Sequence, residues 1–430
     1  MAVRSRFRDW GEQQRLVPLE SLLSEIRQGV FAGGSRRGDV RVRTIRVSDL
    51  HPLLIGAGED SELSAGVVRR HLAFDGDVLV SRVGRLGQVG CVTQATETLV
   101  PREGVFVARP LKKEWGAAIA AALCTEHVRE WLGGLMVGTR SASLTMEQLS
   151  NVLVPSPRHC DFAQIFELVS VAGKLMKDGR EILDRVRGRL GMIMEGAPTE
   201  LNKRRLTWVD QMDCLRGWGW ADVQRHLLIS ELQLRPGSLM PLGDLVDLDA
   251  CRVKTIDVPA QARGLENDEL RPDWYLALPK AKPVSVSDAL EIPTRTTSKR
   301  FFGVDGECLL IPTVGDITGP PVVIPAERAL AESPAINVPI YWLPLINLAT
   351  PRALAMVLDH PFVRLQRQLA GAFSTVAHIT RDDIAGLMIP VVSEKIMDQW
   401  ETELQSAHQM FMDANNKANE AIAIAESWYS

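Results

Sequence analysis

Apolar residues recur at alternating steps of three and four near the end of the chain. They are Met397, Trp400, Leu404, Ala407, Phe411, Ala414, Ala418, Ala421, Ala425 and Trp428. A mean step of about 3.5 residues, kept over about four heptads, is typical of a coiled-coil seam. We therefore expect one long helix here, whose small alanine side chains would let a partner helix approach closely.

A second long helical pattern lies in the middle of the chain, where residues 161–194 contain no proline. Apolar residues recur there at Ile165, Leu168, Ala172, Leu175, Ile182, Val186 and Ile193, and Gly179 interrupts the pattern. The alternative is an ordinary amphipathic helix on a core, but a helix of about 50 Å is long for that role. We expect the two helices to pair through Ile165, Leu168, Leu175, Ile182, Val186, Trp400, Leu404 and Phe411.

Outside the long helices the pattern is mixed α/β. Residues 40–50 alternate between polar and apolar as a strand does, and residues 77–83 and 104–110 are typical of short strands. The leucine- and alanine-rich run 114–132 predicts a helix, and residues 151–157 predict a strand that prolines end. The predicted order is globular unit, long helix, globular unit, long helix.

The two globular segments repeat the same elements in the same order. FDGDVLVSRVGRLGQVG at residues 74–90 has the layout of VDGECLLIPTVGDITGP at residues 304–320. SLTMEQLSNVLVP at residues 143–155 matches HITRDDIAGLMIP at residues 378–390, and two further pairs follow the same order. Self-similarity of this kind indicates a duplication of about half the chain.

Composition limits the class of protein. The chain has 430 residues, 46% of them hydrophobic, and no apolar run long enough to span a membrane. Its first 15 residues are too charged for a signal peptide, so we expect a cytoplasmic protein. The six cysteines are scattered without zinc-ligand spacing, which predicts reduced structural thiols and no metal.

Charge is unevenly distributed. The net charge of −4 argues against a protein that coats nucleic acid non-specifically. Residues 1–110 hold 16 arginines, no lysine and 13 acids, which gives +3, so the rest of the chain carries −7. Arginine without lysine favours fork-shaped recognition of bases or phosphates. A biased base composition of the gene is the alternative.

Three segments are candidates for nucleic-acid contacts. The glycine-rich hairpin after residue 81 carries Arg82, Arg85 and Gln88, side-chain types that bind guanine and adenine edges, although a surface hairpin with solvated arginines has the same pattern. The loop at 138–145, with Thr139, Arg140 and Ser141, suits phosphate contacts; Ser143 could equally cap a helical turn. Its counterpart in the second half holds Ser374 and Thr375.

The third candidate is an arginine-rich strand. It offers Arg36, Arg37, Arg41, Arg43 and Arg46, the last three of which we expect on one strand face. Such a face is either a solvated sheet surface or the binding face for an acidic partner.

Catalytic signatures are absent from the sequence. There is no phosphate-binding loop, dinucleotide fingerprint, nucleophile elbow or zinc-protease motif. Asp75 and Asp77 could suggest a magnesium-dependent nuclease, but no accompanying Glu-x-Lys element follows. We interpret Asp75–Gly76 and Asp305–Gly306 as turns whose carboxylates cap turn amides.

The repeated layout resembles the specificity subunit of type I restriction-modification systems, which holds two target recognition domains apart on a pair of helices. The resemblance covers nearly the whole chain. It rests on FDGDVLVSRVG at residues 74–84, on SASLTMEQLSNVLVPSP at residues 141–157 leading into a long helix, and on the repetition of both.

The resemblance implies an α+β fold with two similar mixed α/β target recognition domains, at 1–157 and 197–391. Two long helices, at 158–196 and 392–430, would pair as an antiparallel coiled coil and give the internal repeat a pseudo-two-fold axis. Expected partners are double-stranded DNA and two copies of an adenine-N6 methyltransferase subunit that brings S-adenosylmethionine. A restriction motor-nuclease subunit could join for cleavage. The chain itself would hold no cofactor and catalyse nothing.

The second half departs from the first at the hairpin. Its counterpart has Thr313 and Thr318 with Asp316 between them, so the arginines are lost and a carboxylate would repel phosphate. We expect Arg295, Lys299 and Arg300 to supply contacts there instead.

Two functions are consistent with these features. The first is a DNA-binding specificity subunit of a DNA methylation complex in phage defence. The second is a non-catalytic scaffold whose paired helices bind partner proteins without reading DNA sequence. Hairpin side chains that point away from a shared basic face would favour the scaffold.

Overall fold

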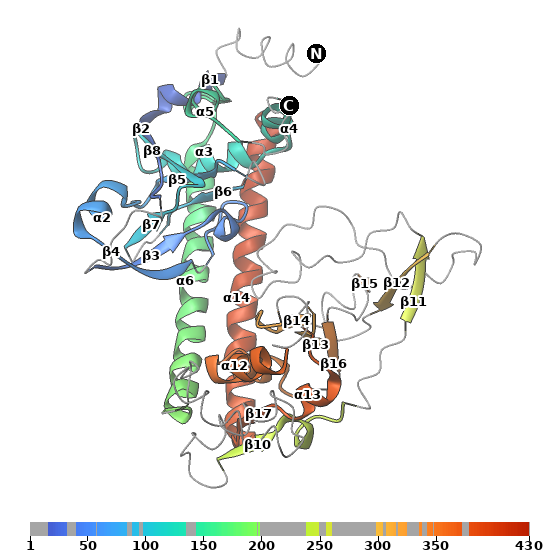
Figure 1. The fold of residues 1–430 in the computed structure, drawn as a ribbon. Coiled ribbons are helices and arrows are strands. Elements are labelled where there is room, and N and C mark those ends of the chain that lie inside the picture. Colours follow the sequence, from blue (N-terminus) through green and yellow to red (C-terminus); the bar gives the residue numbers. More distant parts are fainter. Residues whose placement is uncertain are drawn as a thin grey trace. The chain divides into compact units, whose positions relative to one another are not determined.

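The structure is a computed structural model, and it describes residues 16–31, 40–56, 58–83, 88–93, 98–134, 143–195, 197, 238–248, 255–259, 298–303, 307–314, 317–324, 335–337, 342–346, 348–371 and 378–429. These residues form two compact units (Figure 1). The first unit takes its described residues from 1–181 and 407–430, and the second from 182–274 and 279–406.

A four-stranded antiparallel sheet forms the centre of the first unit. Its strand order is β2 (Leu23–Gln28), β8 (Val105–Pro110), β5 (Val78–Ser81) and β6 (Val89–Cys91). All four residues of β5 are buried, because neighbouring strands flank it and α3 (Trp115–Cys124) packs on it. Residues Gly116–Cys124 of α3 are buried on every side, which explains the helix's run of alanines.

A smaller sheet has the order β4 (Glu59–Leu63), β3 (Val40–Ile45) and β7 (Leu99–Pro101). Its apolar positions pack with α2 (Ala65–His71) in one core cluster. Strand β3 pairs antiparallel with β4 and parallel with β7. The C-terminal ends of strands β3 and β7 therefore lie beside each other.

The first unit also contains several further short elements. Strand β1 (Leu16–Pro18) pairs with β9 (Leu153–Pro155), the short helix η1 (Leu19–Leu22) follows β1, and α4 (Glu126–Gly134) follows α3. Helix α5 (Met146–Ser150) begins with a capping box between Thr145 and Gln148. The cap is therefore Thr145, and Ser143, the alternative candidate for this cap, forms a β-bridge with Val83.

The second unit contains the same kinds of element. Its elements are β10 (Leu239–Pro241), η5 (Leu242–Asp244), β13 (Cys308–Pro312), β14 (Val322–Ile324), β16 (Trp342–Ile346), α11 (Pro351–Leu358), α12 (Pro361–Ala370), α13 (Arg381–Ala385) and β17 (Met388–Pro390). Strands β14, β13 and β16 form one sheet, and β10 pairs with β17. A further sheet has the order β11 (Thr255–Pro259), β12 (Ser298–Gly303) and β15 (Ala335–Asn337).

The internal repeat is visible at the level of single hydrogen bonds. Leu19 N donates to Val152 O at 2.8 Å, and Leu242 N donates to Leu387 O at 2.8 Å. Helix α13 begins with a capping box at Thr380, which matches the box at Thr145 that begins α5. The expected α+β class with two similar units is confirmed, whereas the expected domain limits at 157, 196 and 391 stay predictions.

Two long helices contribute to both units: α6 (Phe162–Ile193) and α14 (Glu394–Ser427). In the first unit, the Phe162 ring stacks on Trp428 at a centroid distance of 5.5 Å. Gly179, further along α6, lies against the ring of Phe411. The two helices therefore run antiparallel in this unit.

The buried positions of the two helices define their inner faces. On α14, the expected Trp400, Leu404 and Phe411 are buried, as are the seam alanines Ala407, Ala414, Ala418, Ala421 and Ala425. On α6, Ile165 and Val186 are buried, but Leu168, Leu175 and Ile182 are only half-buried. The next residues along the chain face inward instead. Val169 and Met176 are buried, and Leu183 is partly buried and packs against the core of the second unit. At these three positions the inner face of α6 is therefore displaced by one residue from the predicted seam.

None of the helices in the described residues combines the length and apolar character needed to cross a membrane. Cys91, Cys124 and Cys308 are buried thiols, and burial raises the pKa of Cys91 and Cys308 to about 12. Cys214 and Cys251 lie outside the described residues.

Candidate nucleic-acid interface

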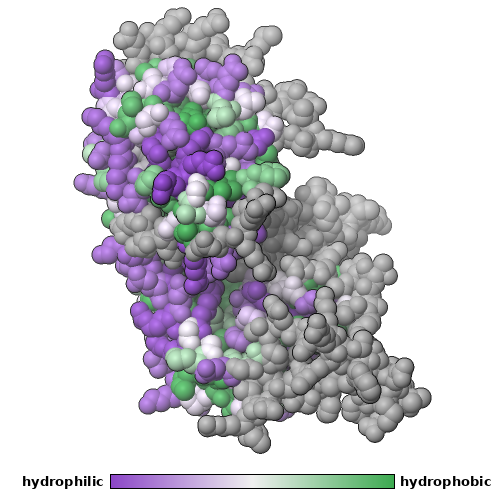
Figure 2. Space-filling view, turned by 60° about the vertical axis from the view of Figure 1, so that its left-hand side comes forward, coloured by the Kyte–Doolittle hydropathy of each residue, from purple (hydrophilic) through white to green (hydrophobic). Residues whose placement is uncertain are grey.

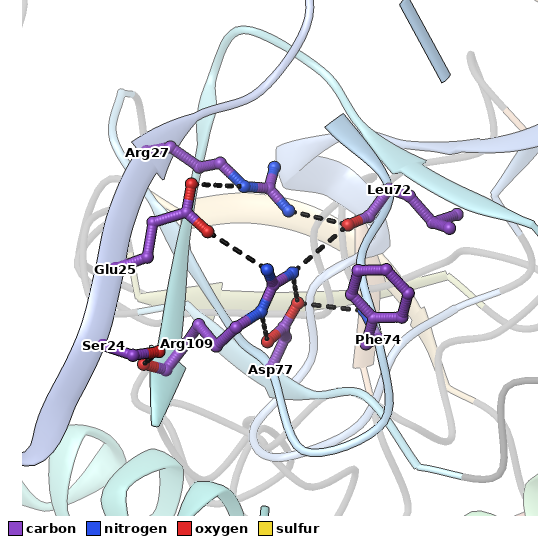
Figure 3. A network of polar contacts seen from close by, with 7 residues as sticks. All are labelled: Ser24, Glu25, Arg27, Leu72, Phe74, Asp77 and Arg109. Carbon is purple, nitrogen blue, oxygen red and sulfur yellow. Dashed lines mark hydrogen bonds and ion pairs between the residues drawn. The ribbon is translucent and has the colours of Figure 1, made fainter. Parts of the chain in front are cut away.

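A buried carboxylate fixes the turn that precedes the glycine-rich hairpin (Figure 3). The Asp77 side chain is 2% exposed, and its two oxygens accept from Nε and Nη2 of Arg109 at 3.0 and 2.9 Å. The same carboxylate accepts from the backbone N–H of Phe74 at 2.9 Å. The carboxylate that caps this turn amide is therefore that of Asp77, two residues after the expected Asp75, and Gly76 supplies the positive φ of +89° that the turn needs.

Further groups complete this cluster around Arg109. Nη1 of Arg109 contacts Glu25 at 3.1 Å, and Arg27 contacts Glu25 at 3.3 Å while donating to the carbonyl of Leu72 at 2.7 Å. The hydrogen bonds to Asp77 raise the pKa of Arg109, whereas burial lowers the pKa of Arg27. Both carboxylates are thus occupied by guanidinium groups, and within the described part of the chain no three metal-ligating side chains cluster.

In the second unit, a carboxylate–arginine pair also lies at the corresponding turn, but other residues form it. Glu307, which corresponds to Asp77, contacts Arg352 of α11 at 2.7 Å. Arg352 also contacts Glu401 of α14 at 3.0 Å, and Glu401 accepts from the backbone N–H groups of Arg352 and Ala353 at 2.8 and 2.9 Å. A glutamate of α14 therefore caps the N-terminus of α11 and ties this turn to the long helix.

Two of the candidate loops start from one point in the first unit. Val83 and Ser143 form an isolated antiparallel bridge, and Leu144 N donates to Arg82 O at 2.8 Å. The hairpin and the polar loop are therefore anchored side by side. Arg82 itself is half-buried, and its side chain lies 3.5 Å from the carbonyl of Glu103. Arg85, Thr139, Arg140 and Ser141 lie outside the described residues.

The second unit has the same anchor at the corresponding positions. Val314 and His378 form an antiparallel bridge, and Ile379 N donates to Thr313 O at 2.9 Å. Thr313 is buried and Thr318 is half-buried, so neither hydroxyl lies on an open surface. Ser374, Thr375 and Arg295 lie outside the described residues, and of Lys299 and Arg300 only the strand β12 is described.

Gln88 turns inward rather than outward. With its side-chain amide nitrogen oriented toward the backbone of residues 47–50, Gln88 donates to the carbonyl oxygens of Val47 at 2.9 Å and Leu50 at 3.1 Å. Its backbone N–H donates to the Ser81 hydroxyl at 3.2 Å. The amide donors that would bind adenine are therefore used to hold the segment around the short helix η3 (Val47–Asp49) against β6.

The arginines of β3 meet an acidic partner inside the same sheet. Arg41 and Arg43 contact Asp60 of β4 at 3.0 and 3.6 Å. Arg36 and Arg37 lie outside the described residues. Arg46 does not share the face of Arg41, because it follows the end of β3 and precedes η3, where it pairs with Glu59. The visible surface of the first unit is mostly hydrophilic (Figure 2).

Sequence reasoning did not single out two residues of this region, Glu59 and Arg102. Arg102 follows β7 and contacts Glu59 at 3.3 Å. The sequence contains a signal for Arg102, since Pro-Arg-Glu-Gly between two apolar runs predicts an exposed turn. Nothing in it indicates that β3 and β7 pair in parallel, which brings Arg102 next to Arg46.

Comparisons with known proteins found no matching family model and no matching curated protein. Solved structures similar to this chain include the S subunit of a type I restriction-modification system from M. genitalium, with 12% identity, a TM-score of 0.35, and coverage of 96% of this chain and 94% of that one.

Two other solved structures are also similar. One is a chain of a type I restriction-modification system studied for its complex assembly and conformational transition, with 14% identity, a TM-score of 0.29, and coverage of 96% and 97%. The other is the HsdS subunit from Thermoanaerobacter tengcongensis, with 13% identity, a TM-score of 0.29, and coverage of 96% and 95%. All three belong to type I restriction-modification systems, the family that the repeated sequence motifs resemble.

Proposed function

We propose that this chain is a non-catalytic subunit that recognises a bipartite DNA sequence, with each unit reading one half. The observation that carries the proposal is the repeated loop anchor. Leu144 N donates to Arg82 O in the first unit, and Ile379 N donates to Thr313 O in the second, each beside an antiparallel bridge. Two equivalent loop pairs on two similar units suit a protein that reads two DNA segments.

The different side chains at the two anchors are what would let the two DNA segments differ. The first unit carries Arg82, which could donate to a guanine edge or to a phosphate. The second unit carries Thr313 at the corresponding position. An arginine fork discriminates guanine from other bases by about 1–3 kcal/mol. A repeat that kept its framework but exchanged its loop residues therefore supports recognition of an asymmetric site.

The proposed complex acts in the cytoplasm as part of host defence against foreign DNA. In it, two adenine-N6 methyltransferase subunits bind this chain and supply S-adenosylmethionine and the reaction, and a motor-nuclease subunit joins for restriction. Partner subunits would also supply much of the phosphate neutralisation, which makes the net charge of −4 compatible with DNA binding.

One observation favours the scaffold function instead. Arg41 and Arg43 already contact Asp60, and the Gln88 amide bonds to the backbone of its own unit. The Gln88 amide is thus used within its own unit, and Asp60 offsets part of the positive charge that Arg41 and Arg43 would present to DNA.

Methylation mapping of the host genome, with and without this gene, separates the two functions. We expect N6-methyladenine in a bipartite motif that disappears when the gene is deleted. Co-purification of partner proteins without any gene-dependent methylation motif would contradict the proposal and favour the scaffold.

A further inference from the structure

Two arginines of the first unit share one carboxylate beside the hairpin. Arg46 follows β3 and Arg102 follows β7, and the parallel pairing of Ile45 with Pro101 brings them together. Glu59, the first residue of β4, contacts Arg46 and lies 3.3 Å from Arg102. The side chains of Arg46 and Glu59 are about half exposed and that of Arg102 is 27% exposed, so the cluster reaches the surface mainly through Arg46 and Glu59.

This cluster is continuous with the base of the hairpin. Arg102 N donates to Ile45 O at 2.8 Å, and Arg82 N donates to Gly104 O at 2.8 Å, two residues further along the same turn. A Cβ on Gly104 would lie 3.0 Å from Val47 and 3.2 Å from Val83, so the turn packs closely against both. The backbones of Arg46, Arg102 and Arg82 therefore lie close together.

Stability does not account for this arrangement. Exposed ion pairs contribute about 0–1 kcal/mol, because water screens them and long side chains lose rotamer entropy. Each guanidinium has five N–H donors, whereas one carboxylate offers only about four lone-pair sites to the two arginines. Most donors of Arg46 and Arg102 thus remain available while Glu59 restricts where the two forks point.

We infer that Arg46 and Arg102 extend the DNA-reading surface of the first unit, and that Glu59 is the residue that positions them. The inference rests on the proposed function and names a part of the same site. The ligand chemistry is a base edge with two acceptors, such as guanine in the major groove, because a held guanidinium fork matches it bidentately. Because Glu59 already restricts the two arginine side chains before DNA binds, less conformational entropy is lost when they contact the base.

The chain offers a matched pair of variants for the test. Glu59→Gln and Glu62→Gln make the same chemical change on the same strand, but Glu62 is exposed and makes no ion pair with a described residue. Methylation motifs would be mapped in cells that express each full-length variant with its partners. For Glu59→Gln we expect about tenfold or greater loss of discrimination at positions within one half of the motif. Glu62→Gln should leave the motif unchanged.

A third variant, Arg102→Lys, keeps the positive charge but removes the fork, and it should relax the same half of the motif. It tests the inference even where Glu59→Gln lowers expression. An unchanged motif in Glu59→Gln and Arg102→Lys would overturn the inference, as would weakening that is equal across all sequences, which identifies phosphate contacts. Absence of any motif with the wild-type gene would instead overturn the proposed function and the inference with it.

Discussion

Asp77 holds the turn that leads into strand β5 and the first hairpin. It is almost completely buried, accepts both bonds of a guanidinium fork and also holds the Phe74 amide (Figure 3). A charge taken out of water is tolerated only when its partners are in place. Removal of the carboxylate would leave Arg109 without its main partner and free the turn that leads into β5.

Substitution of Asp77 by alanine should destabilise the first unit by about 2–4 kcal/mol, since breaking a buried pair leaves an uncompensated charge. Urea unfolding followed by circular dichroism measures the change. Asp75→Ala is the matched control, because Asp75 is more exposed and contacts Lys113 at 3.1 Å at the surface. Its loss should be below about 1 kcal/mol. Equal losses in the two variants would contradict the role assigned to Asp77.

Single residues show where sequence reasoning succeeds and where it fails. A carboxylate cap at the Asp-Gly turn is predictable, because the chemistry is local, although Asp77 and not Asp75 caps the Phe74 amide. Its partner Arg109, 32 residues away, is not, since the sequence does not show which strands lie beside each other. Gln88 was expected to read a base, yet it bonds to Val47 and Leu50, which a long-range fold contact brings to it.

At the scale of elements, the inner face of α6 depends on a choice between adjacent apolar residues. Leu168 and Val169 both suit a seam, and the same holds for Leu175 and Met176. The buried series Ile165, Val169, Ala172, Met176 and Gly179 keeps strict steps of three and four. Gly179, which interrupts the apolar pattern, is itself a member of that series, because its missing side chain makes room for Phe411.

Three glycines of α6 give a test of this packing. A Cβ at position 179 would lie 2.7 Å from Cε1 of Phe411, whereas Gly188 and Gly191 have no atom within 4 Å of that position. Gly179→Ala should therefore destabilise by about 1–3 kcal/mol through overpacking. Gly188→Ala should stabilise by about 0.5–1 kcal/mol, because alanine is the better helix former. Chemical denaturation measures both, and stabilisation by Gly179→Ala would show that Phe411 does not pack there.

The second unit joins its parts of the two long helices by an ion pair with a defined pH response. Arg189 contacts Glu403 at 2.8 and 3.1 Å, and these hydrogen bonds lower the pKa of Glu403 below its ordinary 4.5. A carboxyl group with a lowered folded-state pKa stabilises the protein above its ordinary pKa and loses that contribution as the pH falls. The pair therefore strengthens the helix contact near neutral pH and not in acid.

Glu403→Gln should lower stability near neutral pH by about 0.5–1 kcal/mol, as is typical of a partly exposed pair. The difference from wild type should shrink as the pH falls below about 4.5, where the carboxyl group of the unfolded chain becomes protonated, and should vanish below the lowered pKa of the folded protein. Urea midpoints across this range measure it. Glu420→Gln is the control on the same helix, since Glu420 is half-exposed and pairs with Lys417 one turn away, and the variant should change stability by less than about 0.5 kcal/mol. A difference that does not vary with pH would contradict the assignment.

On the scale of the whole molecule, the duplication is what sequence alone predicts best. Corresponding positions need the same class of residue, so Thr145 matches Thr380 as a cap and Leu149 matches Ile384 in the core. The loops between these positions are free to diverge, and so are contacts such as Asp77–Arg109 and Glu307–Arg352. The framework of the candidate site is therefore predictable, whereas its recognition chemistry is not.

This separation of framework and loops leads to a prediction for both units together. Leu144 and Ile379 are 1% and 2% exposed and hold the two loop pairs through equivalent backbone bonds. Alanine at either position should cost about 2–4 kcal/mol of local packing. If each unit reads one half-site, Leu144→Ala should relax one half of the methylation motif, and Ile379→Ala should relax the other.

Leu149→Ala and Ile384→Ala are the matched controls, because both residues are fully buried in the same repeat but lie beyond the loop anchors. They should lower stability by a similar amount and leave the motif intact. Relaxation of the same half by Leu144→Ala and Ile379→Ala would mean that the units do not read separate segments. An effect of the controls equal to that of the anchor variants would mean that global stability, rather than loop anchoring, sets the specificity.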